Sequence, residues 1–239
     1  MLPSAEDDTH PAQLPRGAQQ DGDGGTVAKR ALAGGTARAD ELQHRVRNTL
    51  AVIRSVFART VATGTSLEEV ANHFQGRFDT ISRFASGRGI DLEVTYGLED
   101  LIWDELLRYP SGAENEIVVT GPPESLPHHV AQPLALAFHE LATNAVKFGA
   151  LAIEPHGGLR VDWSRSGGEL VIRWQESRVP IVGSAPLRSG FGREYIEQAL
   201  PYQIKAESSF ALEPGGVLCT IRLRAGDGPN GAMAAEHEG

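Results

Sequence analysis

The sequence predicts an α+β protein in which a helical hairpin precedes a domain of strands packed against helices. Two consecutive segments before residue 90 have apolar residues at helical spacing. Short β-branched or alternating segments follow, and one long helix-forming segment lies among them. Strands in succession around two or three helices favour a sandwich with the helices on one face of the sheet.

Composition narrows the class of protein. Of the 239 residues, 41% are hydrophobic and 22% charged, which is ordinary for a soluble chain that buries a core. No apolar run reaches the length of a membrane span and no signal peptide opens the sequence, so we expect no membrane partner. The net charge of −9 argues against nucleic-acid binding. A single cysteine, Cys219 in an apolar run, fits a buried thiol in a reducing cytoplasm.

The two ends of the chain differ from its middle. Residues 1–36 are rich in Gly, Ala, Asp, Gln and Pro and lack aliphatic periodicity, and residues 225–239 have the same character. Such segments bury too little surface to offset the entropy of ordering, so we expect both to be disordered. The ordered part then divides into a helical hairpin at 37–89 and a mixed domain at 90–224.

Each helix of the hairpin has one apolar stripe. The first helix is expected from Asp40 to about Thr60, with the stripe Leu42, Val46, Leu50, Ile53 and Phe57. Ser66 to Glu69 is typical of a capping box that opens the second helix. Its stripe is Val70, Phe74, Phe78, Ile81 and Phe84, and Gly87 and Gly89 end it. Because neither stripe completes a core, the hairpin should dock on another domain or pair with a second hairpin.

Elements of the second domain follow from alternation and turn residues. A strand leading into a helix is expected within Asp91–Arg108, a helix that starts at Pro133 and ends at Gly149, and a short helix at Arg193–Leu200. The expected strands are Glu116–Thr120, Leu159–Trp163, Leu170–Glu176, about Ser208–Leu212 and Val217–Leu223.

A polar stripe marks the helix after Pro133. At 100° per residue, Glu140, Asn144 and Lys147 fall within about 60° of one another. The opposite side is apolar and should meet a core, with Leu134, Phe138, Leu141 and Ala145. A carboxylate and an amide oxygen one turn apart suit Mg²⁺, and Lys147 could reach phosphate oxygens. An ordinary solvated face is the alternative.

His44 lies on the outward side of the first helix, almost opposite the apolar stripe, with Asn48 one turn along. A lone example is usually a solvated histidine. A neutral imidazole is also a competent nucleophile near pH 7. Transfer of a phosphoryl group to a histidine nitrogen requires an exposed histidine and a neighbouring domain that can bind Mg-nucleotide. The sequence offers both.

Four segments carry a family resemblance. HRVRNTLAVIRSVFART at 44–60 resembles the phosphoacceptor box of the HWE family of bacterial sensor histidine kinases. FHELATNAVKFGAL at 138–151 resembles its asparagine box, with His139 as the first letter of the family name. The run from Trp174 to Glu176 resembles its W-x-E motif, and SGFGREYIEQAL at 189–200 its second glycine box.

The resemblance implies a GHKL-type α/β sandwich that binds ATP, as in DNA gyrase, behind a hairpin for dimerisation and phosphotransfer. His44 would accept the phosphoryl group and Asn144 would bind Mg²⁺. Glu140 would act in catalysis, and Lys147 would flank the phosphates with it. Glu176 would stand at the adenine-reading position, and Gly190 and Gly192 would let backbone approach the triphosphate. The implied partners are a response-regulator receiver domain and a second copy of the chain, bound through the hairpin. No sensor domain precedes the hairpin, so a sensor is expected in trans unless this is an excised piece.

One motif departs from the family pattern. The family continues W-x-E with a small residue and Gly-Gly-Pro, whereas this chain has Ser177, Arg178, Val179 and Pro180. Val179 cannot adopt positive φ cheaply, and Arg178 would either contact phosphate or obstruct the adenine pocket. A phosphotransfer or docking module with a degenerate nucleotide pocket is therefore the main alternative to a kinase. A GHKL-type ATPase that does not phosphorylate itself is a third, less favoured because His44 is exposed.

Overall fold

The computed structural model describes residues 43, 46–86, 94–109, 116–153, 157–180 and 190–224. The chain divides into two compact units, Met1–Arg47 and Asn48–Gly239, and the arrangement below is that of the second. The segments expected to be disordered, 1–36 and 225–239, lie outside the described residues, as do the expected helix end at Gly87 and Gly89 and the start of the segment at Asp91.

Residues 48–86 form the hairpin. The first helix continues to residue 63, and α2 covers Leu67–Ser86. Ser66 Oγ accepts a hydrogen bond from the Glu69 amide at 3.1 Å, as a capping box requires. The return contact is made one residue earlier than usual, because Glu69 Oε2 accepts from the Thr65 amide at 2.9 Å. The predicted start of α2 is confirmed.

A five-stranded sheet with the order β2-β4-β5-β7-β6 forms the second domain, called the α/β domain (residues 94–224). Its strands are β2 (Glu116–Thr120), β4 (Gly158–Ser166), β5 (Glu169–Ser177), β6 (Ala206–Glu213) and β7 (Gly216–Arg224). Only β2 pairs in parallel, with β4, and the other neighbours are antiparallel. All five strands coincide with or extend the predicted ones.

Helix α3 lies between β1 and β2 in the chain, and helix α4 lies between β3 and β4. β1 (Thr95–Gly97) leads directly into α3 (Leu98–Leu106), as predicted, and pairs with β3 (Ser125–Pro127). The long helix α4 covers His128–Phe148, so the predicted start at Pro133 is wrong. Proline is tolerated near a helix start because the first amides have no intrahelical partner. Here Pro127 already occupies the N-cap, and α4 accommodates Pro133 in its second turn.

The last helical segment is longer than Arg193–Leu200. It comprises α5 (Phe191–Glu194), a π-helical turn η2 (Tyr195–Ala199) and α6 (Leu200–Ile204). Pro201 lies in the first turn of α6, which continues from η2 without a break because Ala199 before it is itself helical. A short 3₁₀ turn, η1 (Ala150–Ala152), follows α4.

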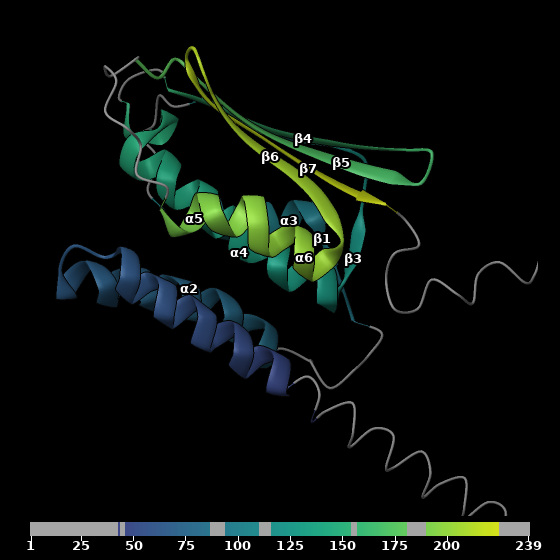
Figure 1. Ribbon diagram of the computed structural model, residues 1–239. Helices are drawn as coiled ribbons and strands as arrows, with labels where there is room; N and C mark the ends of the chain where they lie inside the picture. Colours follow the sequence, from purple (N-terminus) through teal and green to yellow (C-terminus); the bar gives the residue numbers. More distant parts are fainter. Residues whose placement is uncertain are drawn as a thin grey trace, which may run out of the picture. The chain divides into compact units, whose positions relative to one another are not determined.

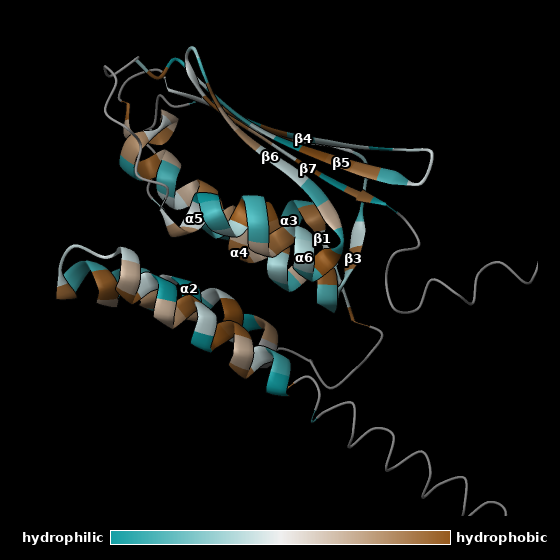
Figure 2. Ribbon diagram, in the orientation of Figure 1, coloured by the Kyte–Doolittle hydropathy of each residue, from teal (hydrophilic) through white to brown (hydrophobic). Residues whose placement is uncertain are grey.

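The helices of the α/β domain cover one face of the sheet, as predicted. Figure 1 shows α3, α4 and α5–α6 beneath β4–β7, with the hairpin on the side of α4 away from the sheet. Hydrophobic residues occur along both hairpin helices as well as in the sheet (Figure 2). Trp174 on β5 and Phe138 on α4 are among the largest fully buried side chains, and Cys219 is buried as expected. The hairpin thus forms a third layer that packs on α4.

Candidate functional site

Helix α4 has its predicted apolar side in the core, since Leu134, Phe138, Leu141 and Ala145 are all at most 1% exposed. The polar stripe is less open than predicted. Glu140 is only 3% exposed, Asn144 is half-buried, and Lys147 is exposed. Helix α2 packs along this side of α4 and covers Glu140. A buried carboxylate needs a partner, because burial of an isolated charge is costly.

Arg77 of α2 is that partner. Its Nε lies 2.7 Å from Glu140 Oε1 and its Nη2 lies 2.9 Å from Glu140 Oε2, a bidentate pair. The two side chains are 6% and 5% exposed. Planar two-point contacts of this kind combine charge with defined geometry. The carboxylate predicted to act in catalysis is therefore neutralised by the hairpin in this structure.

Arg77 also contacts two further elements. Its Nη1 donates to Thr60 Oγ1 of the first helix at 2.7 Å. Its guanidinium carbon lies 3.9 Å from the ring centroid of Phe191, the first residue of α5. One side chain thus joins both hairpin helices to α4 and to the second glycine segment.

Sequence reasoning missed Arg77, although a signal was available. At 100° per residue, Arg77 lies within about 40° of Val70, Ile81 and Phe84, inside the apolar stripe of α2. Arginine is almost never fully buried unless it is paired. A charged residue in such a stripe therefore indicates a buried counter-charge on the surface that the helix covers.

The second glycine segment meets α4 at the polar stripe. A Cβ added to Gly192 would fall 2.9 Å from Glu140 Oε2 and 3.3 Å from Asn144 Nδ2. Only a residue without a side chain allows this close approach. Gly190 is the N-cap of α5, immediately before this contact. The structure therefore brings Gly192 to Glu140 and Asn144, which lie some 50 residues before it in the sequence.

Lys147 is also held by the hairpin. Its Nζ forms a hydrogen bond with Nε2 of His73 on α2, one turn from Arg77. Because an ammonium can only donate, this His73 nitrogen accepts and is unprotonated. Burial, and then the charges of Lys147 and Arg77, lower the pKa of His73, which favours the neutral ring.

Glu176 lies at the C-terminal end of α4. Its Oε2 accepts from the Ala150 amide at 2.8 Å, and its Oε1 accepts from Trp174 Nε1 at 3.3 Å. Burial raises the pKa of Glu176, and these two hydrogen bonds oppose the rise only in part. Glu176 therefore holds the turn after α4 in place, in addition to any contact that it would make with a ligand.

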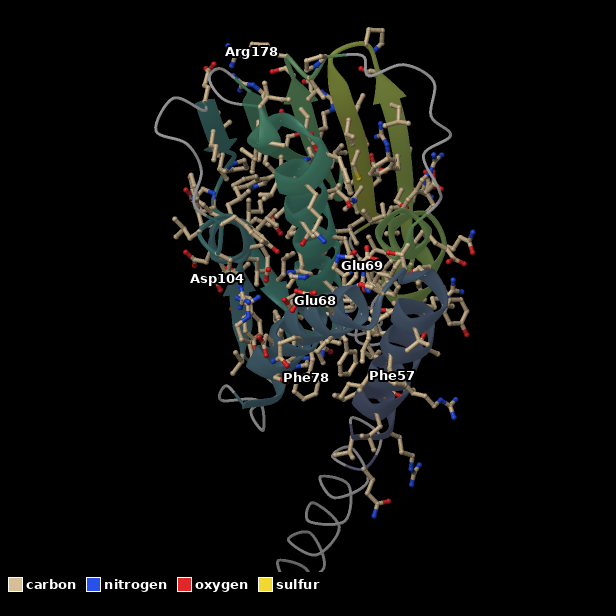
Figure 3. All side chains as sticks on the ribbon, turned by 90° about the vertical axis from the view of Figure 1, so that its left-hand side faces the viewer. Phe57, Glu68, Glu69, Phe78, Asp104 and Arg178 are labelled. Carbon is tan, nitrogen blue, oxygen red and sulfur yellow. The ribbon has the colours of Figure 1, made fainter. Side chains whose placement is uncertain are left out.

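The altered loop after β5 takes its left-handed residue at Arg178, with φ of +63°. Val179 donates its amide to the Gly215 carbonyl at 2.9 Å and is not in this region. The Arg178 guanidinium binds Glu116 Oε2 at 2.8 Å, at the edge of the sheet. Figure 3 shows Arg178 at the end of the sheet remote from the hairpin residues Phe57 and Phe78.

Comparison with known proteins finds similarity to histidine kinases. The HWE histidine kinase family matches residues 41–123. A blue-light-activated histidine kinase of Brucella ovis is 28% identical over 200 residues, which cover 82% of this chain and 40% of the relative. Blue-light-activated histidine kinase 1 of Erythrobacter litoralis is 32% identical over 149 residues, covering 60% of this chain and 40% of the relative. Over these ranges this chain is similar to the HWE histidine kinases. It spans less than half the length of these relatives.

A solved structure supports the fold of this chain. The blue-light-activated histidine kinase of Erythrobacter litoralis superposes with a TM-score of 0.54 at 17% identity, covering 80% of this chain and 63% of that chain. The predicted fold class, a helical hairpin followed by a GHKL-type α/β sandwich, is confirmed.

The motif residues of the HWE family have structural contacts of their own here. His139 is 5% exposed, and its Nδ1 lies 3.0 Å from Oε2 of Glu105, a fully buried carboxylate on α3. Oε1 of Glu105 accepts from Arg83 and Thr80 of α2. The histidine of the motif therefore connects α4 to α3, and Glu105 connects α3 to the hairpin.

Several HWE features fall outside the description. His44 and Arg45, the first two residues of the phosphoacceptor box, and the loop at 181–189 lie among the residues that are not described. Within the described ranges, no group of three or more His, Cys, Asp or Glu side chains could hold a metal ion. The helices described here also include none that is long and apolar enough to cross a membrane.

Proposed function

We propose that this chain is an ATP-dependent protein histidine kinase that phosphorylates His44 from Mg-ATP and passes the phosphoryl group to an aspartate on a response-regulator receiver domain. The observation that supports this best is the meeting of Glu140, Asn144 and Gly192 at one place on α4. Phosphoryl transfer asks for positioning and charge stabilisation, and this place offers a carboxylate, an amide and approachable backbone.

The donor set fits Mg²⁺ bound largely through phosphate. Mg²⁺ takes oxygen ligands, keeps several waters and commonly uses one or two protein groups. Asn144 offers its carboxamide oxygen from a half-buried position beside Gly192. The ion would supply charge neutralisation to the triphosphate. Asn144 would orient it, and the backbone around Gly190 and Gly192 would approach the phosphates.

Glu140 and Lys147 would act once they are free of the hairpin. Glu140 would position the accepting nitrogen or take up its proton, and Lys147 would donate to phosphate oxygens. Glu176 would stand at the adenine position. Its contact with Ala150 fixes the turn after α4, so it would read the base from a rigid place. Arg178 binds Glu116 in this structure, so we assign it no role toward the nucleotide.

We also propose that the hairpin mediates a homodimer in the cytoplasm. Half of the Phe57 surface and 59% of the Leu50 surface are exposed, and Val61 and Phe78 are also exposed. Phe57 and Phe78 lie on the side of the hairpin away from the α/β domain (Figure 3). An apolar patch of several large side chains is typical of an interaction surface. A sensor domain would act from the same chain or in trans.

The decisive experiment is incubation with γ-labelled ATP and Mg²⁺, wild type beside His44→Ala. We expect an acid-labile, base-stable phosphate on the wild type and none on the variant. His129→Ala is the matched control, because His129 is an exposed histidine in the first turn of α4, about three turns before Glu140.

Two outcomes would reject this assignment. Label that persists in His44→Ala places the phosphate elsewhere. If neither protein binds a non-hydrolysable ATP analogue at millimolar concentration, the kinase proposal fails and the phosphotransfer or docking module takes its place.

A further inference from the structure

Two of the three polar residues on the α4 stripe are bound by helix α2. Arg77 binds Glu140 through two hydrogen bonds of 2.7 and 2.9 Å, and His73 binds Lys147. His73 and Arg77 are four residues apart on α2 and therefore face the same way. We call this arrangement the closed state. Of the stripe, only Asn144 keeps its polar group away from these contacts.

We propose that the closed state is a resting state in which Arg77 withholds Glu140 from Mg-nucleotide, so that α2 must leave α4 before the site can act. This inference rests on the proposed function and names the regulation of the same site. A carboxylate that accepts both hydrogen bonds of a guanidinium has neither its charge nor its favoured lone pairs available to a metal or a proton. Substrate binding and the Arg77 contact therefore compete.

The contact is built into the hairpin and is not a surface coincidence. Arg77 is 5% exposed, and its third nitrogen, Nη1, donates to Thr60 Oγ1, so the first helix holds the guanidinium in place. Surface ion pairs between mobile side chains contribute little, whereas a buried pair requires both partners. Phe191 stacks on the same guanidinium, which extends the contact to the second glycine segment.

Gly76 sets the distance between the two helices. A Cβ added there would fall 2.9 Å from Cε1 and Nε2 of the His139 ring. That ring is buried and is held by Glu105, so it cannot turn aside easily. Alanine favours the helix more than glycine does, so Gly76→Ala should keep α2 folded while pushing it off α4. It leaves both Arg77 and Glu140 in place.

Coupling between closure and nucleotide must be reciprocal. If the closed state excludes Mg-nucleotide, then Mg-nucleotide must weaken closure by the same factor. In the wild type, adding a Mg-bound non-hydrolysable ATP analogue should therefore speed amide hydrogen exchange in residues 67–86.

The experiment compares wild type, Arg77→Gln, Gly76→Ala and Arg54→Gln. Arg54 is an exposed arginine on the first helix, so its variant has the same charge change without the contact. Hydrogen exchange of α2, calorimetric titration with the Mg-bound analogue and autophosphorylation are measured for each. We expect faster exchange and affinity tighter by about fivefold or more in Arg77→Gln and Gly76→Ala, the lower end of usual coupling factors. Arg54→Gln should match wild type.

The outcomes separate this inference from the proposed function. Faster exchange and tighter binding without phosphorylation in any protein would keep the closed state and reject the kinase. Phosphorylated wild type with unchanged exchange and affinity in Gly76→Ala would reject the closed state and keep the kinase. In a third outcome, Arg77→Gln binds the analogue tightly but loses phosphorylation, while Gly76→Ala stays active with wild-type affinity. Arg77 would then be part of the active site, and the proposal would be overturned.

Discussion

His139 and Glu105 join the two helices beneath the sheet, with Nδ1 and Oε2 3.0 Å apart. Glu105 has no exposed surface, and three more cationic or hydroxyl groups surround it: Arg83, Thr80 and Arg108. This carboxylate is the meeting point of α2, α3 and α4. Its charge is tolerated only because all of these partners are present.

Glu105→Gln should therefore destabilise the protein by about 1.5–3 kcal/mol, because the amide loses the charge-assisted hydrogen bonds. The free energy of unfolding in urea measures the loss. Glu99→Gln, an exposed glutamate on the same helix, should change it by less than about 0.5 kcal/mol. Equal values for the two variants would show that the buried charge contributes nothing to stability.

Acid should act through the same carboxylate. Burial would raise the pKa of Glu105, but the hydrogen bond from His139 and the neighbouring positive charges hold it below the ordinary 4.5. The unfolded chain then binds the proton more readily, so stability is lost as pH falls below about 4.5. In Glu105→Gln the loss between about pH 5 and pH 3 should be smaller than in wild type.

Asn144→Ala should abolish Mg-dependent phosphorylation while leaving circular dichroism and unfolding cooperativity unchanged, because Asn144 is half-buried and faces Gly192. Asn144→Asp keeps an oxygen ligand and should retain part of the activity. A decrease of less than about tenfold in Asn144→Ala, some 1.4 kcal/mol, would mean that the side chain does not bind the metal.

Arg178→Gly should be more stable than Arg178→Ala by about 1 kcal/mol. Both variants lose the exposed ion pair with Glu116, but only glycine takes the left-handed φ of +63° without steric cost. Urea unfolding of the two variants measures the difference. Equal stability would show that the loop relaxes to negative φ when the ion pair is removed.

Lowering the pH should loosen α2. His73 accepts from Lys147 only when neutral, and its pKa is held below 6.5 by burial and by Lys147 and Arg77, with Glu69 and Glu140 opposing. Stability from this contact is therefore present above about pH 6.5 and is lost as pH falls below it. Hydrogen exchange in α2 should speed up relative to the rest of the chain. His73→Gln accepts from Lys147 at every pH and should lack the effect.

Phe57→Glu should reduce the dimer fraction measured by light scattering, because it puts a charge into the exposed apolar side of the hairpin. Leu212→Glu is the control, since Leu212 on β6 has the same 50% exposure. A monomeric wild type, or loss of the dimer in both variants, would contradict dimerisation through the hairpin.

Local chemistry made much of the fold predictable. β2 was expected at Glu116–Thr120 because its residues are β-branched and Gly-Pro-Pro closes it, and the capping box at Ser66 set the start of α2. Pro133 misled the prediction of α4, since proline near a helix start does not have to be its first residue. The sequence shows that Ser66 caps the start of its helix, but it does not show how far Pro133 lies from the start of α4.

The candidate site was predictable as a stripe and not as a set of contacts. The spacing of Glu140 and Asn144 requires only helical geometry, which sequence contains. The Arg77–Glu140 pair joins residues 63 apart and depends on how the hairpin docks. Docking is decided by the fit of whole surfaces, including the absence of a side chain at Gly76. No short segment of sequence contains that information.

The single parallel pairing in the sheet has a consequence for the order of folding. β4–β5 and β6–β7 are hairpins of neighbouring segments, whereas β2 reaches β4 only after β3 and α4 have intervened. Closing the longer connection costs more chain entropy before any contact is gained. Among the described strands, β2 has no hairpin partner of its own, so it should join the sheet after the two hairpins have formed. In a pulse-labelled refolding experiment, its amides should become protected after those of β5 and β7.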